Sequence, residues 1–239
     1  AIFGLTHNDY IHPSSLVSER YVICASWRWA GEEKVHSVSV LDDPKRFKRD
    51  PSDDRYVIET LHKVLSEADV LVGHNSDSFD KRYLDTRILV HGLDPLPPIP
   101  SIDTCKIAKS KFYFNSGKLD YLGKLLKVGQ KIDTTPGLWM RVLNGEKAAI
   151  REMVVYNQED VRLLERVFNK LRPFIPNHIN RQLFDRGEGC PRCGSHKIQS
   201  RGTHKAITRT YQRWFCNTCR GWFRTLRADK GSTTKFQML

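Results

Sequence analysis

Residues 72–80 read Val-Gly-His-Asn-Ser-Asp-Ser-Phe-Asp, and this stretch decides the fold that we expect for the 239-residue chain. The apolar run that leads into it, residues 69–73, is typical of a short buried strand ending at Gly73. The polar residues that follow then lie at the carboxyl end of a strand, where open α/β sheets place their functional sites. Asp80 is therefore a candidate site residue.

Strand and helix patterns follow one another on both sides of this stretch. Residues 21–29 and 35–41 are rich in β-branched and aromatic residues, so they predict the two strands of a hairpin. Apolar residues at helical spacing predict helices over 56–65 and 119–126. We expect two more helices, one over 79–91 that Gly92 ends and one over 146–171 that Pro173 and Pro176 end. This order predicts an α/β fold, in which a mixed sheet is flanked by helices.

A second acidic motif, Tyr156-Asn-Gln-Glu-Asp160, lies in the last of these helices. Tyr156 and Asp160 are four residues apart, so their side chains share one helix face. A nuclease that hydrolyses phosphodiesters with two metal ions needs several carboxylates at one point, because ions about 3.5–4 Å apart stabilise the attacking and leaving oxygens. A tyrosine beside a metal-bound carboxylate could orient the attacking water.

In this order, the motifs resemble those of the DnaQ-like, or DEDD-type, 3′–5′ exonucleases, which have a ribonuclease H-like fold. The resemblance covers roughly residues 20–172. The segment from Gly73 to Asp80 looks like the second motif of that family, and Tyr156-x-x-x-Asp160 looks like the third motif of its tyrosine-bearing subclass. Ile102-Asp103-Thr104 looks like an Asp-Thr step that lies between the two.

The resemblance implies a role for each of these side chains. Asp80 and Asp160 would bind Mg²⁺ or Mn²⁺, and Tyr156 would position the nucleophilic water. Asp103 would support catalysis, and Asn75 would contact the substrate.

One motif of that family, an Asp-x-Glu on the first strand, is missing before Tyr21. Asp9 does not replace it, because no Glu lies two residues later. Either the natural protein continues upstream of Ala1, or the chain has lost part of its catalytic centre. We expect the first of these explanations.

Four of the six cysteines form two Cys-x-x-Cys pairs with 22 residues between them. This spacing is typical of a structural Zn²⁺ site with four thiolate ligands, here Cys190, Cys193, Cys216 and Cys219. Gly194 follows the first pair, where the backbone must turn sharply. The segment resembles the zinc ribbons of transposase-like and other DNA-binding proteins. Metal spacing, rather than disulfide spacing, favours a reducing, cytoplasmic setting.

The net charge of +12 is concentrated in the C-terminal part of the chain. Residues 173–239 contain 13 Lys and Arg against three Asp and Glu. Such a basic segment indicates a polyanionic partner, and we expect nucleic acid, DNA rather than RNA. Arg209, Arg213 and Trp214 are candidate contacts, because cations bind phosphates and aromatic rings stack on bases. Some of the aromatic residues in this segment would instead form the core of the zinc ribbon.

We therefore predict an exonuclease domain over 1–172, a linker over 173–186, a zinc ribbon over 187–228 and a flexible tail over 229–239. No apolar run is long enough, at about 18 residues, to predict a membrane span. The leading hypothesis is a metal-dependent 3′–5′ exonuclease. A nucleic-acid-binding protein without catalysis and a structure-specific endonuclease remain alternatives. The sequence leaves open the strandedness of the substrate and the oligomeric state.

Overall fold

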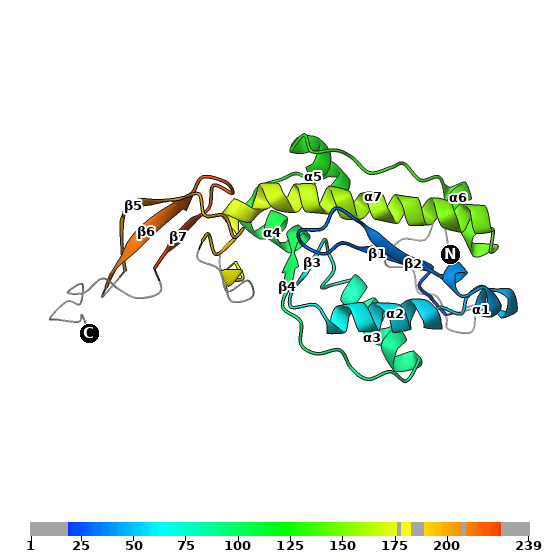
Figure 1. Ribbon diagram of the computed structural model, residues 1–239. Helices are drawn as coiled ribbons and strands as arrows, with labels where there is room; N and C mark the ends of the chain where they lie inside the picture. Colours follow the sequence, from blue (N-terminus) through cyan, green and yellow to red (C-terminus); the bar gives the residue numbers. More distant parts are fainter. Residues whose placement is uncertain (1–18, 176–177, 183–188, 207–208, 226–239) are drawn as a thin grey trace. The chain divides into compact units, whose positions relative to one another are not determined.

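A computed structural model describes residues 19–175, 178–182, 189–206 and 209–225 (Figure 1). The predicted flexible tail and most of the second half of the predicted linker lie outside these residues. The described residues divide into two compact units. The first holds residues up to Lys106 and Phe114–Val167, and the second holds Ile107–Tyr113 and the residues from Phe168 onward.

Short strands and helices follow one another up to residue 174, and three further strands are described after it. The elements in chain order are β1 (Cys24–Trp27), β2 (His36–Ser39), the 3-10 helix η2 (Val40–Asp42), α1 (Pro44–Arg49), α2 (Arg55–Ser66), β3 (Leu71–Gly73), α3 (Asp80–Val90), β4 (Ser101–Asp103), α4 (Thr104–Lys111), α5 (Leu119–Leu125), α6 (Pro136–Leu143), α7 (Lys147–Leu171), the 3-10 helix η3 (Arg172–Phe174), β5 (Ile198–Lys205), β6 (Thr210–Cys216) and β7 (Trp222–Arg224). Among the described helices, none has the length and apolar character needed to cross a membrane.

Two strand pairs make up the sheet structure of the first unit. β1 and β2 are antiparallel, with Cys24 opposite Ser39, so the predicted hairpin is confirmed. β3 and β4 are parallel, with Gly73 opposite Asp103. Within the described residues, the predicted mixed sheet is therefore present as an antiparallel and a parallel pair that share no strand. The parallel pair places Asp103 beside the glycine that begins the first acidic motif.

The largest cluster of buried apolar side chains lies between the hairpin and its flanking helices. Its members come from β2, η2, α1, α2, α6 and α7: Val38, Val40, Phe47, Val57, Leu138, Val142, Ala149, Ile150 and Met153. Figure 1 shows α7 lying along the hairpin. The Gln158 amide donates to the Ser37 hydroxyl at 2.9 Å, and Arg28 forms an ion pair with Glu165 at 2.7 Å. These contacts fix the rotation of α7 and therefore the direction of its acidic motif.

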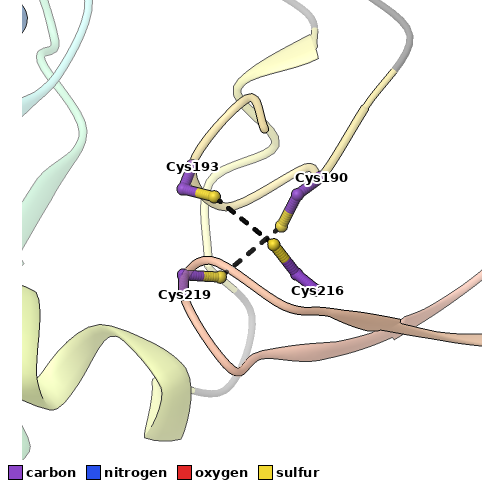
Figure 2. Close-up of side chains that lie close together, drawn as sticks. All are labelled: Cys190, Cys193, Cys216 and Cys219. Atoms are coloured by element: carbon purple, nitrogen blue, oxygen red, sulfur yellow. Dashed lines mark hydrogen bonds between the residues drawn. The ribbon is translucent and has the colours of Figure 1, made fainter. Parts of the chain in front are cut away.

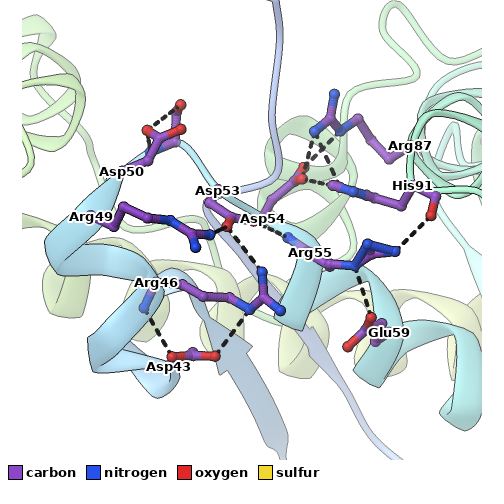
Figure 3. Close-up of polar contacts among 11 residues, drawn as sticks. Asp43, Arg46, Arg49, Asp50, Asp53, Asp54, Arg55, Glu59, Arg87 and His91 are labelled. Atoms are coloured by element: carbon purple, nitrogen blue, oxygen red, sulfur yellow. Dashed lines mark hydrogen bonds and ion pairs between the residues drawn. The ribbon is translucent and has the colours of Figure 1, made fainter.

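A buried ion cluster joins the start of α2 to the end of α3 (Figure 3). The Asp54 carboxylate is fully buried, and both its oxygens accept hydrogen bonds from the Arg87 guanidinium at 2.6 and 2.8 Å. His91 Nε2 lies 2.6 Å from the same carboxylate, and the Val22 amide donates to it at 2.8 Å. The hydrogen bonds that Arg87 donates to Asp54 raise the pKa of Arg87. The cluster holds α3 in place, and α3 begins with Asp80.

The described residues also contain three α-helices that the sequence analysis does not predict, α1, α4 and α6. α1 and α6 each begin with a capping side chain followed by proline. The Asp43 carboxylate accepts a hydrogen bond from the Arg46 amide, and the Thr135 hydroxyl accepts one from the Leu138 amide. Proline after an N-cap residue suits the first helical turn, so this signal was present in the sequence.

The second unit contains one antiparallel sheet in the order β5-β6-β7. Ile198 lies opposite Cys216 in the first strand pair, and Phe215 lies opposite Trp222 in the second. The register between β5 and β6 shifts between Ser200 and Thr203. This sheet carries one of the two Cys-x-x-Cys pairs at its end.

Candidate functional site

Asp103 accepts backbone hydrogen bonds from two segments that meet at the end of β4. Its side chain is buried, and its Oδ1 accepts from the amides of Asn75 at 2.8 Å and Cys105 at 2.9 Å and, more weakly, from that of Lys106 at 3.3 Å. Its Oδ2 accepts from the amide of Asp77 at 3.3 Å. A carboxylate oxygen offers about two lone pairs, so Oδ1 is already saturated. Asp103 therefore holds the loop after β3 against the start of α4.

The loop after β3 takes a tight turn that the sequence of residues 73–76 permits. Asn75 has a φ of 63°, a conformation that asparagine tolerates better than most residues. The hydroxyl of Thr104 donates to the carbonyl of Gly73 at 2.9 Å and lies 2.9 Å from His74 Nδ1. His74 is thus part of the support of this turn. The Asn75 side chain is exposed, as its predicted contact with substrate requires.

Gly73 allows the loop to approach the end of β3 more closely than any other residue would. A Cβ atom at this position would lie 2.1 Å from the Ser76 hydroxyl oxygen and 2.4 Å from the Ser76 Cβ. The nearest backbone atom, the Ser76 Cα, is 3.7 Å away. The conflict is therefore confined to the serine side chain.

Gly73→Ala is expected to destabilise the protein by about 1–3 kcal/mol, because overpacking a buried position forces neighbouring atoms to move. Adding Ser76→Gly removes both clashing atoms and should restore most of the lost free energy of unfolding. Urea denaturation of the two single variants and the double variant measures this coupling. Strictly additive effects of the two substitutions would contradict the close contact.

Asp80 is the first residue of α3 and is exposed to solvent. Protein atoms around its carboxyl group desolvate it and raise its pKa, and the negative charge of Asp103 raises the pKa further. A carboxylate in this position is stabilised by a nearby cation, because positive charge opposes both effects. Asp80 follows β3 by a loop of six residues, and its role as a metal ligand stays a prediction.

Tyr156 and Asp160 lie on one face of α7 and meet at a single cation, the Lys131 ammonium group. Lys131 Nζ donates to Asp160 Oδ2 at 2.5 Å and to the Tyr156 hydroxyl at 3.0 Å, and it lies 5.2 Å from the centre of the tyrosine ring. Burial alone would lower the pKa of Lys131, but the hydrogen bonds to Asp160 and Tyr156 outweigh it and raise the pKa. The shared face predicted from their spacing is confirmed.

The other carboxylate oxygen of Asp160 is buried but unpaired within the described residues. Asp160 Oδ1 is buried and has no hydrogen-bond partner within the described residues, and the same is true of Asn157 Oδ1, one turn earlier on the helix. A buried acceptor without a partner costs about 1–3 kcal/mol. Mg²⁺ prefers oxygen ligands of this kind, so Asp160 fits the binding of a divalent cation.

The predicted carboxylates fit a two-metal site only in part. As far as the structure describes the chain, Asp80, Asp103 and Asp160 do not form a group of ligands close enough to share one ion. Asp103 is occupied by backbone donors, whereas Asp160 offers an open oxygen. Lys131, which sequence reasoning missed, is the positive charge that the structure places beside Asp160.

Four cysteine side chains converge in the second unit (Figure 2). The sulfur atoms of Cys190, Cys193, Cys216 and Cys219 all lie within 4.8 Å of one another. Two of the separations are 3.6 Å, between Cys190 and Cys219, and 3.7 Å, between Cys193 and Cys216. A tetrahedral zinc ion with Zn–S bonds of about 2.3 Å requires sulfur separations of about 3.8 Å. The four thiols therefore fit such an ion.

Both Cys-x-x-Cys pairs have the same backbone geometry. The Gly194 amide donates to the Cys190 carbonyl at 2.8 Å, and the Arg220 amide donates to the Cys216 carbonyl at 2.9 Å. Gly194 and Arg220 have φ values of 76° and 63°, so the sharp turn predicted at Gly194 is confirmed. Burial opposes ionisation of Cys216, but the backbone amides of Cys219 and Thr218 outweigh it and lower the pKa of Cys216 to about 7.

The predicted nucleic-acid contacts do not share one surface. Arg213 and Trp214 are consecutive residues of β6, so their side chains point to opposite faces of the sheet. Arg213 is exposed, whereas Trp214 is half-buried and lies opposite Phe223. Arg209 is exposed just before β6 begins. Alternation along β6 was the signal in the sequence that could have separated Trp214 from the arginine.

Comparison with known protein families identifies the superfamily to which residues 30–172 belong. The sequence profile of the RNase H superfamily matches residues 30–172, which is more than half of the chain. The chain therefore belongs to the RNase H superfamily. A comparison with curated proteins gave no match. Membership of this superfamily indicates a nuclease-type domain that acts on nucleic acid, and divalent metal ions are typical of such nucleases.

Proposed function

We propose that this protein is a divalent-metal-dependent 3′–5′ exonuclease of the DnaQ-like, tyrosine-bearing subclass. The observation that carries the proposal is the pairing of Tyr156 and Asp160 on one face of α7, together with the open oxygen of Asp160. The superfamily match supports hydrolysis of nucleic acid in general. DNA is the proposed substrate, ahead of RNA.

Asp160 and Asp80 would hold the Mg²⁺ or Mn²⁺ ions. When bound, two such ions would stabilise negative charge on the attacking and leaving oxygens of the phosphodiester. The Tyr156 hydroxyl oxygen accepts a hydrogen bond from Lys131, so its proton remains available for the attacking water. Lys131 neutralises Asp160 and orients the tyrosine. Asp103 acts at a distance, because it fixes the loop that leads to Asp80.

The C-terminal sheet would serve as a zinc ribbon that holds nucleic acid. Zn²⁺ bound by the four cysteines would play a structural role, since four protein ligands leave no open position for a reacting water. The sulfur separations and the matching backbone turns support this assignment. The high positive charge of residues 173–239 supports a polyanionic partner.

A time course with 5′-labelled single-stranded DNA, in Mn²⁺ and in EDTA, tests the exonuclease. A descending ladder of products that retain the 5′ label, and that EDTA abolishes, is the expected result. A circular single strand serves as the control, because an exonuclease needs an end. Cleavage of the circle would favour the structure-specific endonuclease. Retention of the oligonucleotide without cleavage would favour a binding protein, the alternative suggested by carboxylates that do not converge within the described residues.

A further inference from the structure

The strand register divides the side chains of the C-terminal sheet between two faces. Successive residues of a strand point to opposite faces, and residues directly opposite each other on neighbouring strands share a face. Arg213 lies opposite Arg224, and Phe215 lies opposite Trp222. These four side chains therefore lie on one face. Tyr211 joins them by alternation along β6.

On this face each aromatic ring lies beside an arginine. The Arg224 guanidinium is 4.1 Å from the centre of the Tyr211 ring, and the Arg213 guanidinium is 5.0 Å from that of Trp222. A third pair, Arg201 over Phe215, has a distance of 5.7 Å. We name these six residues the arginine–aromatic face. Trp222 is 48% exposed, and all three arginines are exposed as well.

No acidic residue balances the charge of this face. The sequence from Gly189 to Thr225 contains eight Lys and Arg and no Asp or Glu. The arginines are held instead by ring contacts and by backbone groups, as in the hydrogen bond from Arg213 Nε to the Arg201 carbonyl at 2.9 Å. A guanidinium that stacks on a ring keeps N–H groups at its edge, where a phosphate can bind.

We propose that the arginine–aromatic face binds single-stranded nucleic acid by stacking unpaired bases on its rings and guanidinium planes, while the guanidinium edges bind phosphates. Flat aromatic and guanidinium surfaces suit bases that are free of a duplex, because paired bases expose only their edges in the grooves. The charge of the face is complementary to the phosphate backbone. This proposal rests on the proposed role in nucleic-acid processing, but binding can be measured without hydrolysis.

The opposite face has a different composition and provides the control surface. Trp214 and Phe223 are paired there and half-buried, and Cys216 points to the same side with its sulfur in the metal site. Lys205 is exposed on this side, opposite Thr210. If a partner bound through charge alone, replacing Lys205 would weaken its binding as much as replacing Arg224.

The test is fluorescence anisotropy with labelled single strands of about 12 nucleotides, one of DNA and one of RNA, a length within the roughly 4–16 nucleotides of a small binding domain. The full chain is used without added Mg²⁺ or Mn²⁺ and without chelator, so that metal bound by the cysteines stays in place. Trp222→Ala is expected to weaken binding about 5- to 100-fold, and Trp222→Phe should retain most of the affinity. Zinc content and circular dichroism verify that each variant is folded.

Charge is tested separately by Arg224→Ala, with Lys205→Ala as the matched control. Each phosphate contact adds about 0.7 to the slope of log affinity against log salt for single strands, so Arg224→Ala should lower the slope by that amount. Lys205→Ala should leave it unchanged. Preference for the DNA or the RNA strand identifies the nucleic acid, and either preference supports the proposal.

Three results would overturn the inference. They are wild-type affinity in folded Trp222→Ala, equal losses for Arg224→Ala and Lys205→Ala, and tighter binding of a duplex than of the single strand. Hydrolysis, measured on the same protein preparations after Mn²⁺ is added, separates the two proposals. If binding depends on Trp222 but no 3′ ladder forms, only the exonuclease proposal is wrong. If the ladder is normal and Trp222→Ala binds as tightly as the wild type, only the proposal for the arginine–aromatic face is wrong.

Discussion

Asp160→Asn is expected to lower kcat of the metal-dependent hydrolysis by about 10³-fold or more. The amide that replaces the carboxylate carries no charge, so it would hold a divalent cation far less tightly. A metal ion contributes several kcal/mol of charge stabilisation to a phosphodiester transition state, and this contribution would be lost with the ion. Tyr156→Phe should have a smaller effect, since it removes one hydroxyl and leaves the carboxylate in place.

Glu159→Gln is the matched control for this prediction. Glu159 precedes Asp160 on α7 and forms an ion pair with Arg162, so its substitution changes the same charge on the same helix. The control should hydrolyse DNA at close to the wild-type rate. Rates are compared with saturating Mn²⁺, and Mn²⁺ binding is measured by calorimetry. A ladder made by Asp160→Asn at the wild-type rate would remove Asp160 from the site.

Removal of metal from the four-cysteine cluster, or replacement of Cys193 by serine, is expected to unfold the C-terminal sheet. The buried residues described between Gly189 and Thr225 are two glycines and two of the four clustered cysteines. No large apolar side chain is fully buried there, so packing contributes little to the stability of the sheet. Zinc binding to such domains contributes about 10–16 kcal/mol of apparent free energy, which is then also folding free energy.

Zinc content and hydrogen exchange measure this prediction. The wild-type chain should contain one zinc per molecule, and Cys193→Ser should contain much less. Amides of β5, β6 and β7 should lose protection in the variant and in chelator, while those of α2 and α7 keep theirs. Cys24→Ala is the control, because burial raises the pKa of Cys24 to about 12 and the neutral thiol is no ligand. Unchanged protection of the sheet without metal would contradict the prediction.

Secondary structure was largely predictable from local pattern. The predicted helices over 56–65, 79–91, 119–126 and 146–171 are confirmed as α2, α3, α5 and α7. α2 and α5 have apolar residues at a period that one helix face can bury, and this property needs no knowledge of the partner. Gly92 and Pro173 mark the ends of α3 and α7 in the sequence. α1, α4 and α6 were missed, and none of them spans more than eight residues. The equally short α5 was predicted because Leu119, Leu122 and Leu125 form a leucine repeat that the other three lack.

The candidate catalytic site was predictable only where its residues are close in the sequence. Tyr156 and Asp160 share a face because helix geometry alone requires it. Lys131 was not predicted, because it lies 25 and 29 residues before the side chains that it contacts. Likewise, the saturated hydrogen bonding of Asp103 depends on Asn75, a residue 28 positions away that the parallel pairing of β3 and β4 brings to it.

Local sequence pattern was enough to predict the order of strands and helices, the grouping of the four cysteines and the basic character of the C-terminal part. These properties follow from periodicity, from the short reach of a Cys-x-x-Cys turn and from composition, all of which are local. Only the tertiary structure decided which charge lies beside Asp160 and which aromatic residues join the arginines on one face of the sheet. Both depend on contacts between residues that are far apart in the sequence, such as the register of paired strands. The free energy of packing selects these contacts.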